Sequence, residues 1–281
     1  MRHLLVVADD YGISPAVSAG IRELAEDRRL TATGVMANMP AWAAEAAALR
    51  ALHGRIAVGL HFTLTDQQPL GELPALAPSG RLPSITKLLL RGLLGGIPRQ
   101  EVADEFERQL DRFERYFGAP PDFIDGHQHA HLLPGVWQTV HAAFGRRLDP
   151  RKCWLRDCAD PHANYRISRF KAGVISKLAR ASSEAARAKA IRTNQGFSGF
   201  YDYATGSLAQ NFTPMLKMAG DGHLMMVHPG HVDQALRDVD SLTDPRQLEW
   251  EFLSGDEFPA QLAEAGFVLA DPGFLIDGAV N

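Results

Sequence analysis

The stretch Leu4-Leu5-Val6-Val7-Ala8-Asp9-Asp10-Tyr11-Gly12 decides the fold that this sequence predicts. Its apolar residues form a short continuous run, which is typical of a strand buried on both faces of a parallel sheet. Two carboxylates follow directly, at the carboxyl end of that strand. Ser14 has the character of a helix N-cap, with Pro15 at the first helical position. The stretch therefore predicts a strand-loop-helix unit whose loop carries two acidic side chains.

The same unit recurs along the chain. Further strands are expected at 33–39, 56–60, 122–125, 153–156, 224–227 and 267–269, and helices at 42–52, 84–94, 100–117, 134–144 and, with an interruption near Gly255, 245–265. Alternating β and α segments favour a parallel sheet or a barrel. A Pro- and Gly-rich excursion at 66–83 has the length of a functional loop. Since no linker or repeat divides the chain, we expect residues 1–281 to form a single α/β domain.

Composition excludes several classes of protein. The chain has 281 residues, of which 46% are apolar, so it can bury a sizeable core. The formal net charge of -4 gives no basic field for nucleic acid. No apolar run is long enough to span a bilayer, and the run before Asp9 is too short for a signal peptide, so we expect a cytoplasmic protein. Cys153 and Cys158 do not indicate a disulfide framework.

Residues 166–192 differ in character from the rest of the chain. They hold eight Lys or Arg and a single acidic residue, Glu184, with apolar residues interleaved. We expect a basic helical insertion here. Such a helix can contact an anionic membrane surface peripherally or receive an anionic substrate, and it is also the ordinary pattern of a solvated helix face. The sequence does not fix the oligomeric state, and a homodimer is compatible with it.

A second stretch, Asp125-Gly126-His127-Gln128-His129-Ala130-His131, places one carboxylate and three imidazoles at alternate positions. If the chain stays extended here, the two-residue period points all four side chains to one side. Histidine is the commonest metal-binding side chain and titrates near neutral pH, so the row suits a metal site or a proton-transfer site. The alternative is a polar strand end whose histidines satisfy backbone groups. The clustering favours the first interpretation.

Polar side chains follow four of the predicted strands: Asp9 and Asp10, His61, the row 125–131, and His228. Sites in parallel sheets and β/α barrels lie outside the carboxyl ends of the strands, so we expect these groups to converge. One carboxylate and two imidazoles can hold a divalent metal with positions left open for water and substrate, as hydrolysis requires. One aspartate would then stay off the metal as base, and His228 is the natural proton donor. Taken alone, Asp9 and Asp10 are equally compatible with turn chemistry, His61 is more often a structural histidine, and His228-Pro229-Gly230 can be a turn.

The motifs around these residues resemble those of the YdjC-like carbohydrate deacetylases, which include chitooligosaccharide and hopanoid-associated members. They occur in the family's order and cover nearly the whole chain: Ala8-Asp9-Asp10-Tyr11-Gly12-Ile13-Ser14, Gly59-Leu60-His61-Phe62-Thr63-Leu64, Asp125-Gly126-His127-Gln128-His129-Ala130-His131, Asn194-Gln195-Gly196-Phe197 and His228-Pro229. The resemblance implies a distorted, TIM-like β/α barrel with its active site at the carboxyl ends of the strands. It also implies metal-dependent removal of an acetyl group from an N-acetylated sugar.

The same resemblance implies roles for single residues. Asp10, His61 and His127 would bind one divalent metal ion, Asp9 would act as base and His228 as acid. Of the three histidines in 125–131, His129 is expected to have a structural role. Further residues are expected to contact substrate or to support the ligands: Tyr11, Asp125, His131, Arg156, Asn194 and Phe197. Such a donor set does not distinguish zinc, magnesium, manganese or cobalt.

Two other functions are compatible with these residues. A metal-dependent phosphoesterase can use the same carboxylate and histidine ligands. A metal-binding or carbohydrate-binding regulatory protein without turnover would need no base. We expect the substrate to be an N-acetylhexosamine unit of an oligosaccharide or glycoconjugate.

Overall fold

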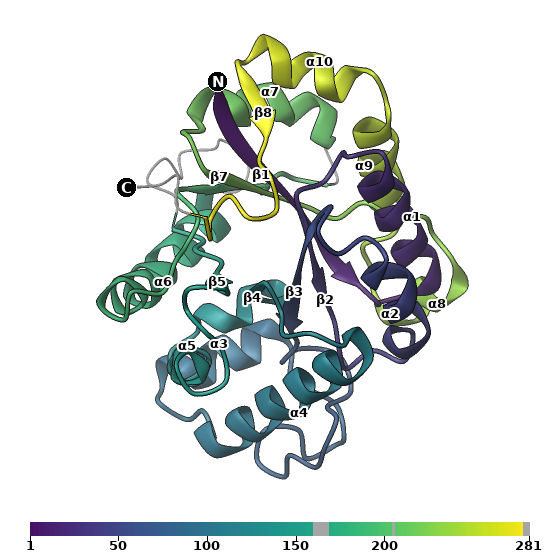
Figure 1. Cartoon of the computed structure of the whole chain (residues 1–281). Coiled ribbons are helices and arrows are strands. Elements are labelled where there is room, and N and C mark those ends of the chain that lie inside the picture. Colours follow the sequence, from purple (N-terminus) through teal and green to yellow (C-terminus); the bar gives the residue numbers. More distant parts are fainter. Residues whose placement is uncertain (160–168, 204–205, 278–281) are drawn as a thin grey trace.

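The computed structural model in Figure 1 describes residues 1–159, 169–203 and 206–277. The strands are β1 (Arg2–Tyr11), β2 (Ala32–Val35), β3 (Ala57–Phe62), β4 (Phe123–Gly126), β5 (Trp154–Leu155), β6 (Phe197–Ser198), β7 (His223–Val227) and β8 (Phe267–Leu269). The helices are α1 (Pro15–Glu26), α2 (Trp42–Arg50), α3 (Ile85–Leu93), α4 (Arg99–Phe117), α5 (Trp137–Ala143), α6 (Arg169–Ala188), α7 (Leu208–Met218), α8 (Gln234–Val239), α9 (Asp244–Ser254) and α10 (Glu257–Glu264), with a 3-10 helix η1 (His127–Leu132).

The strands form one parallel sheet in the order β5-β4-β3-β2-β1-β7-β6. The first half of β1 also pairs with β8, and its second half pairs with β2. An isolated parallel bridge between Leu155 and Thr193 joins β5 to the chain just before β6, which brings the two ends of the sheet together. The sheet is thereby curled into a distorted β/α barrel with helices around it, as Figure 1 shows, and this confirms the expected fold.

Alternation along the strands separates two cores. Leu4, Val6 and Ala8 of β1 belong to the larger cluster that packs against the helices, whereas Leu5 and Val7 belong to a second cluster. That second cluster takes one face of nearly every strand: Ala32, Ala57, Phe123, Trp154, Phe197, Leu224 and Met226. These side chains fill the barrel interior, as expected when inward and outward positions alternate. The same alternation, continued to the carboxyl ends of the strands, points polar side chains into the barrel.

Local signals placed the first helix correctly. The Ser14 hydroxyl accepts from the backbone N–H of Val17 at 3.2 Å, and Pro15 occupies the first turn of α1. Helix α4 ends at Gly118, whose φ of 84° is the left-handed conformation that glycine adopts without a Cβ penalty. Several elements are shorter than predicted: β2 ends at Val35, α5 begins only at Trp137, and β5 is limited to Trp154 and Leu155.

The basic segment forms helix α6. Ile175, Ala179 and Ala186 are buried, while Lys177 and Arg180 are among the exposed residues. The prediction at 166–168 lies outside the described residues. Among the residues that the structure describes, no helix is both long enough and apolar enough to cross a membrane.

Candidate metal centre and active site

Asp9 and Asp10 are neighbours in β1, and a regular strand would point them to opposite faces. The pairing of β1 with β2 is irregular between Ala8 and Tyr11, and Asp10 has a left-handed φ of 69°. A non-glycine residue in such a conformation costs about 1–3 kcal/mol, which the surrounding contacts must offset. Both carboxylates are 2% exposed, and both come close to His61. The strand irregularity therefore delivers two adjacent acidic groups to one site.

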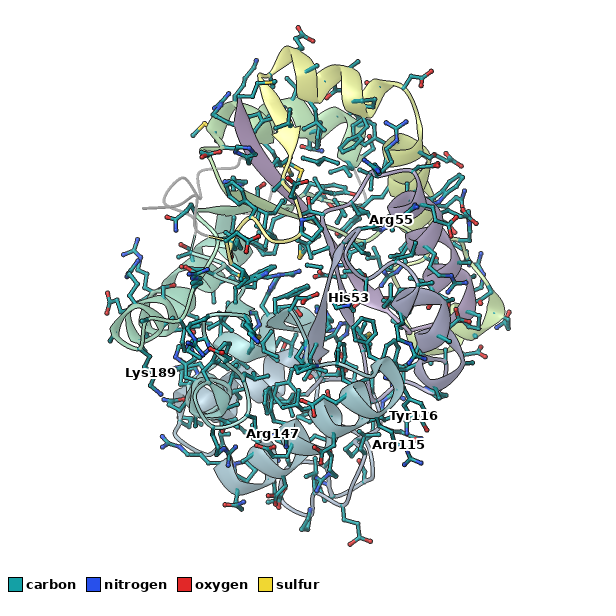
Figure 2. The ribbon with its side chains drawn as sticks, viewed as in Figure 1. His53, Arg55, Arg115, Tyr116, Arg147 and Lys189 are labelled. Atoms are coloured by element: carbon teal, nitrogen blue, oxygen red, sulfur yellow. The ribbon has the colours of Figure 1, made fainter. Side chains whose placement is uncertain are left out.

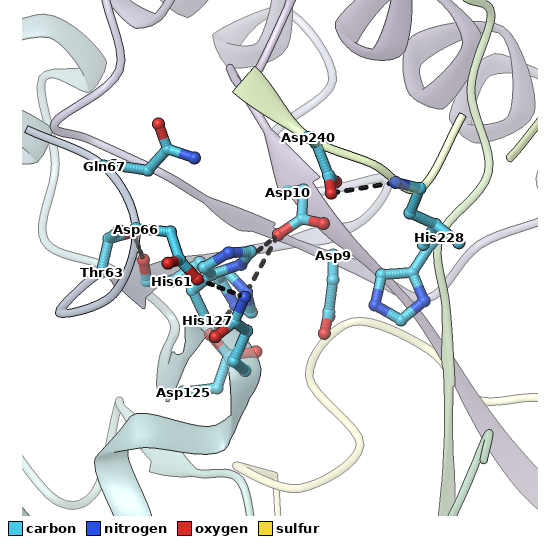
Figure 3. Close-up of polar contacts among 12 residues, drawn as sticks. Asp9, Asp10, His61, Thr63, Asp66, Gln67, Asp125, His127, His228 and Asp240 are labelled. Atoms are coloured by element: carbon cyan, nitrogen blue, oxygen red, sulfur yellow. Dashed lines mark hydrogen bonds and ion pairs between the residues drawn. The ribbon is translucent and has the colours of Figure 1, made fainter. Parts of the chain in front are cut away.

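Asp10, His61 and His127 form a compact buried cluster, drawn in Figure 3. The Asp10 Oδ1 atom lies 2.8 Å from His127 Nδ1 and 3.3 Å from His61 Nε2. One ligand atom from each residue lies within 4.8 Å of the other two. Burial alone would raise the pKa of Asp10, but His127 and Arg246 overcome this and hold that pKa well below its usual range. The Asp10 carboxylate is therefore ionised and available to a cation.

The ring of His61 is oriented from behind by Asp125. Its Nδ1 lies 2.7 Å from Asp125 Oδ1, which leaves Nε2 facing Asp10. A carboxylate that holds the far nitrogen of a histidine is the usual support for a metal-binding imidazole. Burial lowers the pKa of His61, yet Asp125 and Asp9 outweigh it and raise the pKa to about 10. The surroundings thus favour positive charge at this position, so the donor set fits a divalent metal ion.

A second group, Asp9, His61 and Asp125, meets the same distance criterion. Its carboxylates are already engaged, because Arg156 Nη1 and Nη2 donate to Asp9 Oδ2 and Oδ1 at 2.8 and 2.6 Å, and Arg156 Nη2 also lies 2.6 Å from Asp125 Oδ2. Asp125 Oδ1 faces His61, so both oxygens of each carboxylate in this group have a partner. In the first group Arg246 occupies only Asp10 Oδ2, and Oδ1 faces the two histidines. The group Asp10, His61 and His127 is therefore the better candidate for the metal.

His228 approaches from the opposite side of the site (Figure 3). Its Nδ1 lies 3.0 Å from the Tyr203 hydroxyl, and its backbone N–H donates to Glu249. Burial lowers the pKa of the His228 ring to about 4, although Asp10 and Asp9 act in the other direction. The ring is therefore neutral at pH 7.

Helix α9 contributes two charged residues that the sequence analysis missed. Arg246 is 1% exposed and its Nη2 bridges Asp10 Oδ2 at 2.6 Å and Asp240 Oδ2 at 2.7 Å. Glu249, one turn later and equally buried, accepts from the Tyr201 hydroxyl as well as from His228. Helical spacing places both on the face that carries Leu253, so charged residues at core-facing positions were the available signal.

The expectation that residues 125–131 stay extended is wrong. After Gly126 the chain turns into η1, in which Gln128 and His129 have left-handed φ values of 50° and 60°. The three histidines consequently diverge, and of these only His127 contacts Asp10 in the described part of the chain. His131 Nε2 lies 3.3 Å from the Arg156 carbonyl oxygen, and burial, which outweighs the opposing charge of Asp125, lowers its pKa to about 3.

His129 lies against two aromatic rings and a cysteine instead. Its ring meets Phe197 and Phe200 edge-on at 5.7 and 5.2 Å, and its Nδ1 lies 3.6 Å from the Cys158 sulfur. This placement is compatible with the structural role expected for His129.

The other candidates lie behind the site surface. Tyr11 is fully buried, its hydroxyl donates to the Glu45 carbonyl oxygen at 3.0 Å, and its ring packs on Trp42. This position suits a residue that supports the fold rather than one that contacts a sugar. Asn194 accepts from the backbone N–H of Asp157 and donates to the carbonyls of Asp157 and Gly196, which ties the end of β5 to β6. Phe197 is fully buried against His129.

A parallel β/α barrel with buried carboxylates and imidazoles at the carboxyl ends of its strands is typical of metal-assisted hydrolases. The family model described as YdjC-like protein matches residues 3–264, and the chain belongs to this family. A carbohydrate deacetylase of Geobacillus stearothermophilus is 31% identical over 272 residues, covering 95% of this chain and 96% of that protein. A chitooligosaccharide deacetylase of Serratia marcescens is 29% identical over 273 residues, covering 96% and 98%.

Solved structures show the same fold. A candidate cellobiose-phosphate cleavage protein of Enterococcus faecalis V583 superposes with a TM-score of 0.73 at 23% identity, covering 96% of this chain and 97% of that one. A peptidoglycan N-acetylglucosamine deacetylase is more distant, with a TM-score of 0.51 at 11% identity, covering 99% and 89%. These two likenesses bear on the fold alone.

Proposed function

We propose that this protein is a metal-dependent hydrolase that removes the acetyl group from an N-acetylhexosamine unit. Family membership and the names of its carbohydrate and chitooligosaccharide deacetylase relatives support this reaction. The observation that carries the proposal is that the two adjacent aspartates, Asp9 and Asp10, have different partners. Asp10 Oδ1 contacts two imidazoles, whereas both carboxylate oxygens of the adjacent Asp9 accept from Arg156.

Asp10, His61 and His127 would hold one divalent ion. When bound, such an ion polarises the acetyl carbonyl and lowers the pKa of water toward about 7. Arg246 keeps Asp10 Oδ2 occupied, so Oδ1 is the oxygen that faces the two histidines.

Asp9 is the proposed general base. It accepts a proton from the water whose oxygen attacks the acetyl carbonyl carbon, and the bidentate contact with Arg156 fixes the carboxylate for that step. The carbon–nitrogen bond then breaks and releases acetate, and the sugar nitrogen leaves as an amine after gaining a proton.

His228 is the proposed donor of that proton. It lies across the site from His61 and His127, and Tyr203 orients its ring. Because the ring is neutral before the reaction, it must first take up a proton from solvent, which the nearby carboxylates of Asp10 and Asp9 and the negative charge developing on the acetyl oxygen favour. His228 then gives this proton to the sugar nitrogen, and the proton that Asp9 took from the water returns to solvent, so that both residues regain their starting forms.

The decisive experiment measures two products from matched substrates. Purified protein is reconstituted with zinc, manganese, cobalt or magnesium and supplied with N-acetylglucosamine oligomers or with phosphorylated sugars. We expect acetate release that is lost in Asp10→Asn. Release of phosphate without acetate would identify a phosphoesterase instead, and metal binding without release of either product would leave a binding protein.

A further inference from the structure

Helix α3 has an unusual outward face. Leu90, Leu93 and the next residue, Leu94, are 58%, 62% and 77% exposed. They are three of the six large apolar side chains exposed among the described residues. Their spacing puts them on one side of the helix, where a surface helix ordinarily carries polar groups. We call these three residues the leucine patch.

The leucine patch is comparable in size with the largest apolar patch on a typical monomeric protein and too small for a stable protein interface. The three exposed fractions amount to roughly 350 Å² of residue surface, and the largest patches on monomers, about 300–600 Å², are often functional. A standard protein interface buries about 800 Å² on each partner. The apolar surface alone therefore does not account for docking of a second protein.

The charge around the patch indicates the partner. The segment 73–100, which carries the patch between Glu72 and Glu101, contains no Asp or Glu and four basic residues, namely Arg81, Lys87, Arg91 and Arg99. The Glu101 carboxylate accepts from the backbone N–H groups of Ala75 and Leu76, and Arg91 donates to the Ala75 carbonyl oxygen, whereas Lys87 lies one turn before Leu90 on α3. Within the described part of the chain, none of the four forms an ion pair. Arg147, labelled in Figure 2, behaves differently, because Glu107, Asp111 and Glu114 neutralise it. A second copy of this chain would bring like charges together at the patch, whereas an anionic surface complements it.

We propose that the leucine patch and its basic rim dock the protein on an anionic phospholipid bilayer. Apolar side chains that project from a basic helix enter the boundary between headgroups and acyl chains, while Lys and Arg contact the phosphates. The docking surface borders the candidate active site, because Gly92 of α3 packs on Pro134, and α3 lies against η1, which carries His127. The inference is independent of the proposed reaction, since it needs no turnover.

The test is co-sedimentation of the full chain with vesicles of phosphatidylcholine alone or with about a third phosphatidylglycerol. Each Lys or Arg near such a surface contributes about fivefold in binding. We expect at least tenfold tighter binding to the anionic vesicles, and loss of that binding in the Leu90→Glu, Leu93→Glu double variant. Leu248→Glu is the matched control, because Leu248 is 52% exposed on α9, and it should bind like the wild type.

A second variant tests the basic residues separately, in case the leucine double variant does not fold. Lys87→Glu leaves the leucines intact and should weaken binding to anionic vesicles severalfold, with an unchanged circular dichroism spectrum. Three results would overturn the proposal: no sedimentation of the wild type, equal binding to both vesicle types, or binding that both variants retain. A dimer in light scattering that the leucine variant dissociates would show that a second copy covers the patch.

Discussion

Replacing Asp9 with asparagine separates the two buried groups that could bind a metal. If Asp10, His61 and His127 are the ligands, Asp9→Asn keeps all of them and removes only the proposed base. Loss of a general base lowers kcat/KM by about 10²–10⁴-fold. The Asp9 charge would act on the cation only through space, and the guanidinium of Arg156 offsets part of it, so its loss should weaken metal binding less than loss of a direct ligand would. Hydrolysis should therefore be lost in Asp9→Asn while metal binding by Asp10, His61 and His127 stays measurable.

The cost in stability should be moderate, because the buried Arg156 keeps Asp125 as a partner and the asparagine oxygen still accepts a hydrogen bond. A weakened buried hydrogen bond of this kind costs about 1–3 kcal/mol, so the Tm should fall by several degrees.

Two measurements test this on Asp9→Asn, Asp10→Asn and His127→Ala. Isothermal titration with Zn²⁺ or Mn²⁺ gives the metal affinity of each variant, and an acetate-release assay gives its activity. We expect metal binding to be retained in the first variant and lost in the other two. If Asp9→Asn loses the metal while His127→Ala keeps it, the group of Asp9, His61 and Asp125 is the real site. If Asp9→Asn keeps more than about a tenth of the activity, Asp9 is not the base.

Three further outcomes are expected. His129→Ala should keep metal affinity within about tenfold, since its ring lies against Phe197 rather than Asp10; loss equal to that in His127→Ala, read by the same titration, would contradict this. Gly59→Ala should destabilise by about 1–3 kcal/mol in urea unfolding, because the new Cβ would lie 2.5 Å from the Phe123 ring; an unchanged midpoint would show that the barrel interior yields freely. Burial, aided by Lys189, lowers the pKa of His141 from 6.5 to about 4. The unfolded chain therefore binds a proton at His141 before the folded protein does, so the stability contributed by the neutral ring is present above pH 6.5 and is lost as the pH falls toward 4. The urea midpoint of His141→Gln should vary less over that range than that of the wild type.

Alternation of apolar and polar residues was enough to predict the barrel and most of the convergence. Four of the predicted strands are followed by polar side chains, and alternation along each strand then sets whether those side chains face into or out of the barrel. Ala57 and Gly59 are inward positions of β3, so His61 two residues later is inward too, and the same holds for Asp125 after Phe123. Strand ends of a parallel sheet meet at one rim, so residues far apart in sequence could be assigned to one site.

Local backbone geometry was beyond the same reasoning. The polar strand ends predict that Asp9 and Asp10 share one site, but a strict two-residue period gives no reason why neighbouring residues should face the same way. The same period predicts a converging histidine row, which the structure does not have. The causes are left-handed residues at Asp10, Gln128 and His129, and side chains of these types do not by themselves encode such a conformation. Charged residues on α9 were missed because a helical pattern identifies a buried face without naming the element that it meets.

The contact between Arg246 and Asp10 joins residues that are 236 positions apart. The segments that become β1, β3 and η1 are synthesised long before α9, so the Asp10 carboxylate has no Arg246 to pair with during most of synthesis. Closing so large a loop is slow and depends on the rest of the barrel being in place. The finished arrangement around Asp10 is therefore a late event in folding, and a chain truncated before α9 has every proposed metal ligand but an unfinished site.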